Sequence, residues 1–273
     1  MAKWLYEMKW PEVKEQLERD DVALFPVGST EQHGPHLPTG VDAQEAITVA
    51  EGVSERTGCV IAPPLWYGWT PHHMAYPGTV TLRPETLTAI AEDVCTSLIY
   101  HGFKRVVIIN GHRVANLPPL EIAAVKVRNR TGGFIAIYDI ALSAVDKIGA
   151  ATSGVTGNVG HACESETSLM LYRYGHLVDM SKAVRAVHTP DPKYAWSFGN
   201  PDPTGVGLNL VSVRSTIAEF GERSGPTGVG GDATLASVEK GQRIYEGIVE
   251  NLCELVERWR TAPVTLRTFD PPL

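Results

Sequence analysis

The sequence has few cysteines, and they form no motif. Its four cysteines, Cys59, Cys95, Cys163 and Cys253, are far apart and include no CxxC pair. This spacing argues against both a disulfide framework and a zinc knuckle. It favours a protein of a reducing compartment.

Long apolar runs and an excess of basic charge are also missing. No stretch approaches the roughly 18 apolar residues that a membrane span requires, and the polar first 20 residues lack the apolar core of a signal peptide. The formal net charge of −7 at pH 7 argues against broad nucleic-acid binding, which needs a basic surface. We therefore expect a cytoplasmic protein that binds a small-molecule substrate and neither nucleic acid nor membrane.

No internal repeat, low-complexity tract or linker divides the chain. Its 273 residues, 43% of them hydrophobic, are enough to bury a sizeable core. We expect a single domain over residues 1–273.

Short apolar runs alternate with helical patterns along most of the chain. Strands are predicted at 21–29, 59–68, 104–112 and 134–140, and helices from Pro11 and at 43–58, 83–102, 117–133, 164–175 and 233–260. Residues 185–232 are rich in Pro, Gly, Asn and Ser and are interpreted as long loops with short elements. The alternation predicts an α/β fold with three layers, a mostly parallel sheet with helices on both faces.

Metal-ligating side chains follow two of these strands and precede a helix. The stretch GSTEQHGPHLPTGVDA, residues 28–43, contains Glu31, His33 and Asp42, and VVIINGH ends in His112. Ligands in parallel α/β folds bind at the carboxyl ends of the strands, where both stretches fall. The motif GHACESETS adds Glu164, with His161 and Glu166 beside it.

The mixture of carboxylates and imidazoles is typical of zinc, manganese or iron sites. Three carboxylates and two imidazoles exceed one open tetrahedral zinc site and suit two metals that share a bridging carboxylate. We assign Asp42 as the bridge. Glu31 and His112 complete the first site, and His33 and Glu164 complete the second.

Several nearby residues have simpler interpretations. His36 is expected to be hydrogen-bonded or solvated, and Glu166 is equally well explained as a capping residue in the first turn of a helix. One of His72 and His73 is expected to line the pocket. Trp66, Tyr67, Trp69 and Tyr76 are interpreted as packing residues, and GVGGD, residues 228–232, as a turn whose Asp232 caps a helix.

The chain resembles the creatininase family in five stretches that span residues 22 to 245 in the family's order. They are VGSTEQHGPHLPTGVDA, YPGTVTL, VVIINGHRVAN, GHACESETSLML and GVGGDATLASVEKG. The resemblance implies a two-metal centre in an α/β fold, with Glu31, His33, Asp42 and His112 as ligands, and a homo-oligomer, usually a hexamer. It also implies a proton-transfer role for His161, with Glu166 orienting it or bracing the site.

One position departs from creatininase itself. Creatininase itself has its fifth metal ligand, a Glu, two residues after the His that corresponds to His112. This chain has Val114 at that position. Many relatives without that Glu carry a His-Ala-Gly-Glu pattern, and the HACE of this chain resembles it, so Glu164 is expected to fill the position. The chain is therefore not expected to be creatininase proper; the segments LWYGWTPHH and NGHRVANLPPL, with Arg113, resemble more the branch that hydrolyses diketo-inositols.

These observations predict an enzyme, a hydrolase with two divalent metal ions, with zinc as the first expectation and manganese or iron as alternatives. Its leading expected reaction is the opening of a cyclic amide or a related carbonyl compound. The alternative is hydrolysis of a C–C bond in a cyclic polyol ketone. A third interpretation is a non-catalytic metal-binding or assembly protein.

Overall fold

The computed structural model describes residues 1–113, 115–155, 157–187 and 215–272, and its centre is a five-stranded parallel sheet. The strand order is β1-β3-β2-β4-β5, and every neighbouring pair is parallel. The strands are β1 (Lys3–Trp4), β2 (Val22–Val27), β3 (Val60–Ile61), β4 (Arg105–Asn110) and β5 (Phe134–Asp139).

Helices connect the strands and extend beyond the last one. The α-helices are α1 (Trp10–Leu17), α2 (Val41–Thr57), α3 (Pro84–Tyr100), α4 (Leu117–Thr131), α5 (Ile140–Ser143), α6 (Val145–Ala151), α7 (Glu164–Tyr174), α8 (Ile217–Ser224) and α9 (Val238–Arg260). The 3-10 helices are η1 (Leu5–Glu7), η2 (Pro71–Ala75), η3 (Gly175–Leu177), η4 (Met180–Lys182), η6 (Gly225–Thr227) and η7 (Ala233–Leu235).

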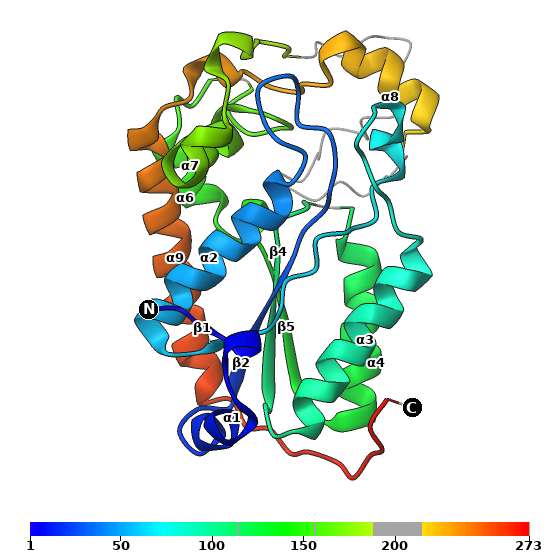
Figure 1. Cartoon of the computed structure of the whole chain (residues 1–273), viewed down its shortest axis with the longest axis vertical. Helices are drawn as coiled ribbons and strands as arrows, with labels where there is room; N and C mark the ends of the chain where they lie inside the picture. Colours follow the sequence, from blue (N-terminus) through cyan, green and yellow to red (C-terminus); the bar gives the residue numbers. More distant parts are fainter. Residues whose placement is uncertain (114, 156, 188–214, 273) are drawn as a thin grey trace, which may run out of the picture.

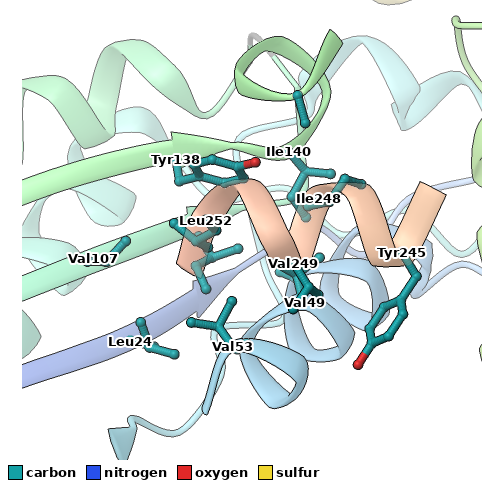
Figure 2. Close-up of a cluster of buried hydrophobic side chains, with 14 of the residues drawn as sticks. Leu24, Val49, Val53, Val107, Tyr138, Ile140, Tyr245, Ile248, Val249 and Leu252 are labelled. Atoms are coloured by element: carbon teal, nitrogen blue, oxygen red, sulfur yellow. The ribbon is translucent and has the colours of Figure 1, made fainter. Parts of the chain in front are cut away.

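The sheet separates two apolar cores, as alternate strand residues point to opposite faces. On one face Leu24, Val107 and Tyr138 pack against Val49 of α2 and Leu252 of α9. Figure 2 shows α9 crossing this face, with its apolar stripe turned toward the strands.

On the other face the neighbouring strand residues Phe25 and Ile108 pack against Leu87 of α3 and Leu120 of α4. In Figure 1, α2, α6, α7 and α9 lie on one side of the sheet and α3 and α4 on the other. The predicted fold class, a three-layer α/β fold with a parallel sheet, is confirmed.

Three predicted elements differ from the structure. The helix predicted at 233–260 is divided into η7 and α9, and α9 is capped by Ser237. The strand predicted at 59–68 is only Val60–Ile61, because Pro63 and Pro64 have no N–H for the ladder; the chain touches β2 again at Leu65, opposite Val27. Helix α8 lies in the stretch interpreted as loop, and the 188–214 part of that interpretation lies outside the described residues. In the parts of the chain described above, no helix is both long and apolar enough to cross a membrane.

Candidate metal centre

The centre forms where the first turn of α2 meets the ends of β2 and β4. Two glycines make this approach close enough. A Cβ on Gly28 would lie 2.3 Å from the backbone nitrogen of Ala43, and one on Gly111 would lie 2.0 Å from the carbonyl oxygen of Asp42. Any larger residue would push away the helix turn that carries Asp42.

Asparagine side chains fix the turn after β4. Asn110 Nδ2 donates to the carbonyl oxygen of His112 and to Asp139 Oδ2, both at 2.8 Å. Asn116 Nδ2 donates to the carbonyl oxygen of Gly28 at 3.0 Å, which ties this turn to the end of β2. The buried amides thereby hold the His112 backbone beside the loop that carries Glu31 and His33.

Asp42 lies at the middle of the polar cluster. Its Oδ1 is 3.2 Å from His33 Nε2, and its Oδ2 is 3.0 Å from His112 Nδ1. His112 Nδ1 is also 3.2 Å from Glu31 Oε2. All four side chains are buried, so the structure brings together four of the five ligands predicted from the sequence.

The buried cluster leaves polar atoms without hydrogen bonds. Within the described residues, Glu31 Oε2, His33 Nε2 and Asp42 Oδ2 are buried, and apart from the close contacts between oppositely charged groups given above they have no hydrogen-bond partner. Such atoms are costly in a protein interior unless something satisfies them. Their nitrogen and oxygen chemistry fits divalent zinc, manganese or iron.

Burial and close charges shift the pKa values of the cluster strongly. Burial raises the pKa of Glu31 to about 7. Burial alone would lower the pKa values of His33 and His112, but the neighbouring carboxylates outweigh it and raise them to about 10 and about 9. The same histidines outweigh burial at Asp42 and hold the pKa of its carboxyl well below its usual range.

His161 reaches the cluster from a loop held by the GVGGD turn. The backbones of His161 and Gly230 exchange two hydrogen bonds, of 3.1 and 2.8 Å, and Ala162 has a positive φ of 51°. His161 Nε2 donates to the carbonyl oxygen of Gln32 at 2.7 Å, which leaves Nδ1 with a lone pair facing Glu31 Oε1 at 3.8 Å. Burial and the charge of His33 lower the pKa of His161 well below its usual value, so this imidazole is neutral.

The fifth predicted ligand lies elsewhere. Glu164, fully buried, accepts hydrogen bonds from the Ser153 backbone and hydroxyl and from Lys240 Nζ at 2.7 Å, so its oxygens link α7 to α9 and to the loop at Ser153. Among the residues that the structure describes, it belongs to none of the groups of side chains close enough to share a metal ion. Glu166 does, with His33 and His161, although it also caps α7 by accepting the backbone N–H of Cys163 at 3.3 Å.

The contacts of His73 with Gln32 and Glu31 were not predicted from the sequence. Gln32 Nε2 lies 3.0 Å from His73 Nδ1, while Gln32 Oε1 accepts the Gly34 N–H, so the amide donates to the ring. Burial and the neighbouring histidines hold the pKa of His73 well below its usual value, so the ring is neutral and its proton is on Nε2, 3.4 Å from Glu31 Oε1. The expectation that one residue of the pair His72 and His73 lines the pocket is confirmed, since both do.

The other singled-out residues lie outside the cluster. His36 is buried and its Nε2 is 2.9 Å from the Thr167 hydroxyl, as expected of a hydrogen-bonded histidine. Asp232 caps η7 by accepting the backbone N–H of Thr234 at 3.1 Å. Tyr76 donates to the carbonyl oxygen of Gly225, and Trp66 and Tyr67 are partly exposed away from the pocket lining.

Comparison with known proteins identifies the family of this chain. The family model for creatininase, creatinine amidohydrolase, matches residues 6–256. The chain belongs to the creatininase family. The family resemblance inferred from the five motifs is therefore confirmed.

The relatives are hydrolases of different substrates. The chain is 32% identical to the 3-dehydro-scyllo-inosose hydrolase of Thermotoga maritima over 91% of this chain and 81% of that one. It is 30% identical to the creatinine amidohydrolase of Pseudomonas putida over 79% of this chain and 89% of that one. Among solved structures, a creatinine amidohydrolase with 26% identity superposes with a TM-score of 0.79 over 96% of this chain and 99% of that one.

These comparisons show an enzyme, a hydrolase of the creatininase family. The non-catalytic interpretation is thereby set aside. The matching creatininase structures include one described as a manganese form and one described as a Zn-Zn type. These two solved relatives are thus described with divalent metals, and the described part of this chain contains three groups of side chains that could hold a metal ion.

Proposed function

We propose that this enzyme opens a cyclic amide or a related carbonyl substrate at a centre of two divalent metal ions. The two oxygens of Asp42 carry the proposal, because one faces His33 and the other faces His112. A carboxylate placed between two imidazoles in this way is suited to bridge two ions. Zinc remains the first expectation and manganese or iron the alternatives.

The ligand sets are drawn from two of the side-chain groups of the structure. Glu31, Asp42 and His112 form one group and would hold the first ion. His33 and Glu166, which form another group with His161, would hold the second ion together with Asp42, whose Oδ1 is 3.2 Å from His33 Nε2. Glu166 replaces Glu164 in this proposal, because the oxygens of Glu164 are used by Lys240 and Ser153.

His73 and His161 have different proposed roles beside Glu31. The Nε2–H of His73 faces a Glu31 oxygen and orients this carboxylate, as residues behind metal ligands do. His161 keeps the unprotonated Nδ1 facing the cluster and is the proposed proton carrier to the leaving group. Bound divalent ions would supply an acidified water as the nucleophile and would polarise the substrate carbonyl.

A second candidate reaction is hydrolysis of a C–C bond in a cyclic polyol ketone. It is favoured by the 32% identity to a protein named 3-dehydro-scyllo-inosose hydrolase. Turnover of a cyclic diketone without turnover of any cyclic amide would select it. A single domain, a homo-oligomer such as a hexamer and a cytoplasmic location remain further proposals from the sequence.

The deciding experiment compares metal content in two glutamate variants. Protein purified without chelator is expected to hold two ions per chain, and Glu166→Gln to hold about one, because an amide oxygen is a poorer ligand than a carboxylate. Glu164→Gln is the matched control, two residues away on the same helix, and should keep both ions. Loss of an ion from Glu164→Gln, with none lost from Glu166→Gln, would reverse the assignment.

A further inference from the structure

A pocket of about 330 Å³ lies against the candidate metal centre, and its lining includes two arginines. Three carboxylates line it, those of Glu31, Asp42 and Glu166, and all three belong to the metal groups. The other charged side chains among the described lining residues are Arg113 and Arg223. The proposed metal ions would add further positive charge to the same space.

Arg223 lies one aromatic ring away from the cluster. Its Cζ is 5.4 Å from the ring centroid of Phe220, its neighbour one turn earlier on α8. The same ring contacts the imidazoles of His72 and His73, at centroid distances of 4.9 and 4.5 Å, and the edge of Tyr76 at 6.4 Å. Figure 1 shows α8, in yellow, beside the cyan segment that contains both histidines.

The Phe220 ring gives the guanidinium of Arg223 a water-poor setting. Phe220 is buried and Arg223 is partly buried, so a contact from Arg223 is less weakened by solvent than one at the open surface. A guanidinium stacked on a ring is also held in a restricted set of orientations. Arg223 is therefore a pocket-lining cation whose guanidinium is held against the Phe220 ring.

Arg113 also lines the pocket, directly after His112 in the chain. Its side chain is exposed, and its charge opposes the effect of burial, which raises the pKa of Glu166. Arg113 thus lies near the second proposed metal group and adds positive charge at the rim.

We infer that the substrate carries a carboxylate outside the bond that is cleaved, and that Arg223 binds it. The inference rests on the proposed function, since it names the substrate class of the same pocket. An arginine fork matches the two oxygens of a carboxylate and is a specific receptor for that group. Arg113 contributes to attraction at the rim, and Arg223 determines specificity.

Two matched ligand pairs test the inference on the metal-loaded enzyme. The cyclic amides are hydantoin-5-acetate and hydantoin-5-acetamide, and the cyclic diketones are 3,5-dioxocyclohexane-carboxylate and its carboxamide. Because each pair differs only in charge, wild-type protein should bind the carboxylate about 10- to 100-fold more tightly in calorimetry, the range of a charged hydrogen-bonded pair. Equal binding within both pairs, or no binding by any of the four, would overturn the inference.

Variants then assign the preference to Arg223. Arg223→Gln should remove the discrimination within a pair by weakening only the carboxylate, and Arg223→Lys should restore part of it as a point charge. For any pair that is turned over, the loss should appear in KM with kcat nearly unchanged. Arg128→Gln is the control, because Arg128 also lies over a ring, that of Phe134 at 6.0 Å, but outside this pocket.

Binding and turnover separate this inference from the proposed function. Carboxylate-selective binding that depends on Arg223, with no ring opening by the metal-loaded enzyme, would support the inference and count against the proposed reaction. Ring opening that is equal for both members of a pair and unaffected by Arg223→Gln would support the proposed reaction and count against the inference about Arg223.

Discussion

Two glutamates in the first turn of α7 serve different parts of the molecule. Glu164 and Glu166 are two positions apart, so their side chains diverge by about 200° around the helix axis. Glu166 faces His33 and His161, whereas Glu164 faces Lys240 of α9. A sequence motif places both acids near the site, but the packing of α7 against α9 decides the rotation of the helix and thus which acid faces the cluster.

The substitution Glu164→Gln is expected to lower the stability of the protein and leave its metal content unchanged. The change weakens a buried contact to Lys240 and removes an acceptor of Ser153, so the free energy of unfolding should fall by about 1–3 kcal/mol, as for other charged hydrogen bonds. Urea unfolding of the metal-loaded protein measures it, with Glu250→Gln on the exposed side of α9 as the control. Unchanged stability in Glu164→Gln would contradict the linking role.

Elements with strong periodicity were predictable, and those shaped by tertiary contacts were not. The runs at β4 and α4 carry apolar residues at the spacing of their elements, and prediction and structure agree within a few residues. Helix α8 was missed although Thr216 and Glu219 form a capping box, a signal that a search for helix starts would have found. Because this helix was not predicted, Phe220 and Arg223 were not recognised as residues that line the pocket.

The close junction of α2 with the end of β4 depends on Gly111. Gly111→Ala places a Cβ 2.0 Å from the Asp42 carbonyl oxygen, so the first turn of α2 must move and carry Asp42 with it. We expect loss of both ions and a destabilisation of about 1–3 kcal/mol, as for overpacked cores. Metal analysis and urea unfolding measure these effects. Gly149→Ala in α6 is the control, as nothing lies within 4 Å of its added Cβ. Unchanged metal content and stability in Gly111→Ala would mean that the close approach is not required.

The candidate centre joins distant parts of the whole molecule. Its residues come from the loop after β2, the start of α2, the end of β4 and the segment that enters α7. Because ions held there bind the folded chain and not the unfolded one, they stabilise the fold by mass action. Without ions, charged histidines paired with Asp42 occupy the same buried space.

Metal binding by the whole protein is therefore expected to release protons and to strengthen as pH rises. The pKa values of His33 and His112, about 10 and about 9 in the metal-free protein, lie above the ordinary value of 6.5, so both imidazoles hold a proton at pH 7.5 that a metal ion must displace. Calorimetry in two buffers of different ionisation heat should show this release.

The same pKa shifts determine the direction in which the stability of the metal-free protein changes with pH. A raised histidine pKa contributes stability that is fully present below pH 6.5 and is lost as the pH rises through 9 and 10. The melting temperature of the metal-free protein should thus fall over that interval more than that of the metal-loaded protein, whose histidines are already unprotonated. Parallel melting curves, or metal uptake at pH 7.5 without proton release, would show that His33 and His112 are neutral before the ions bind.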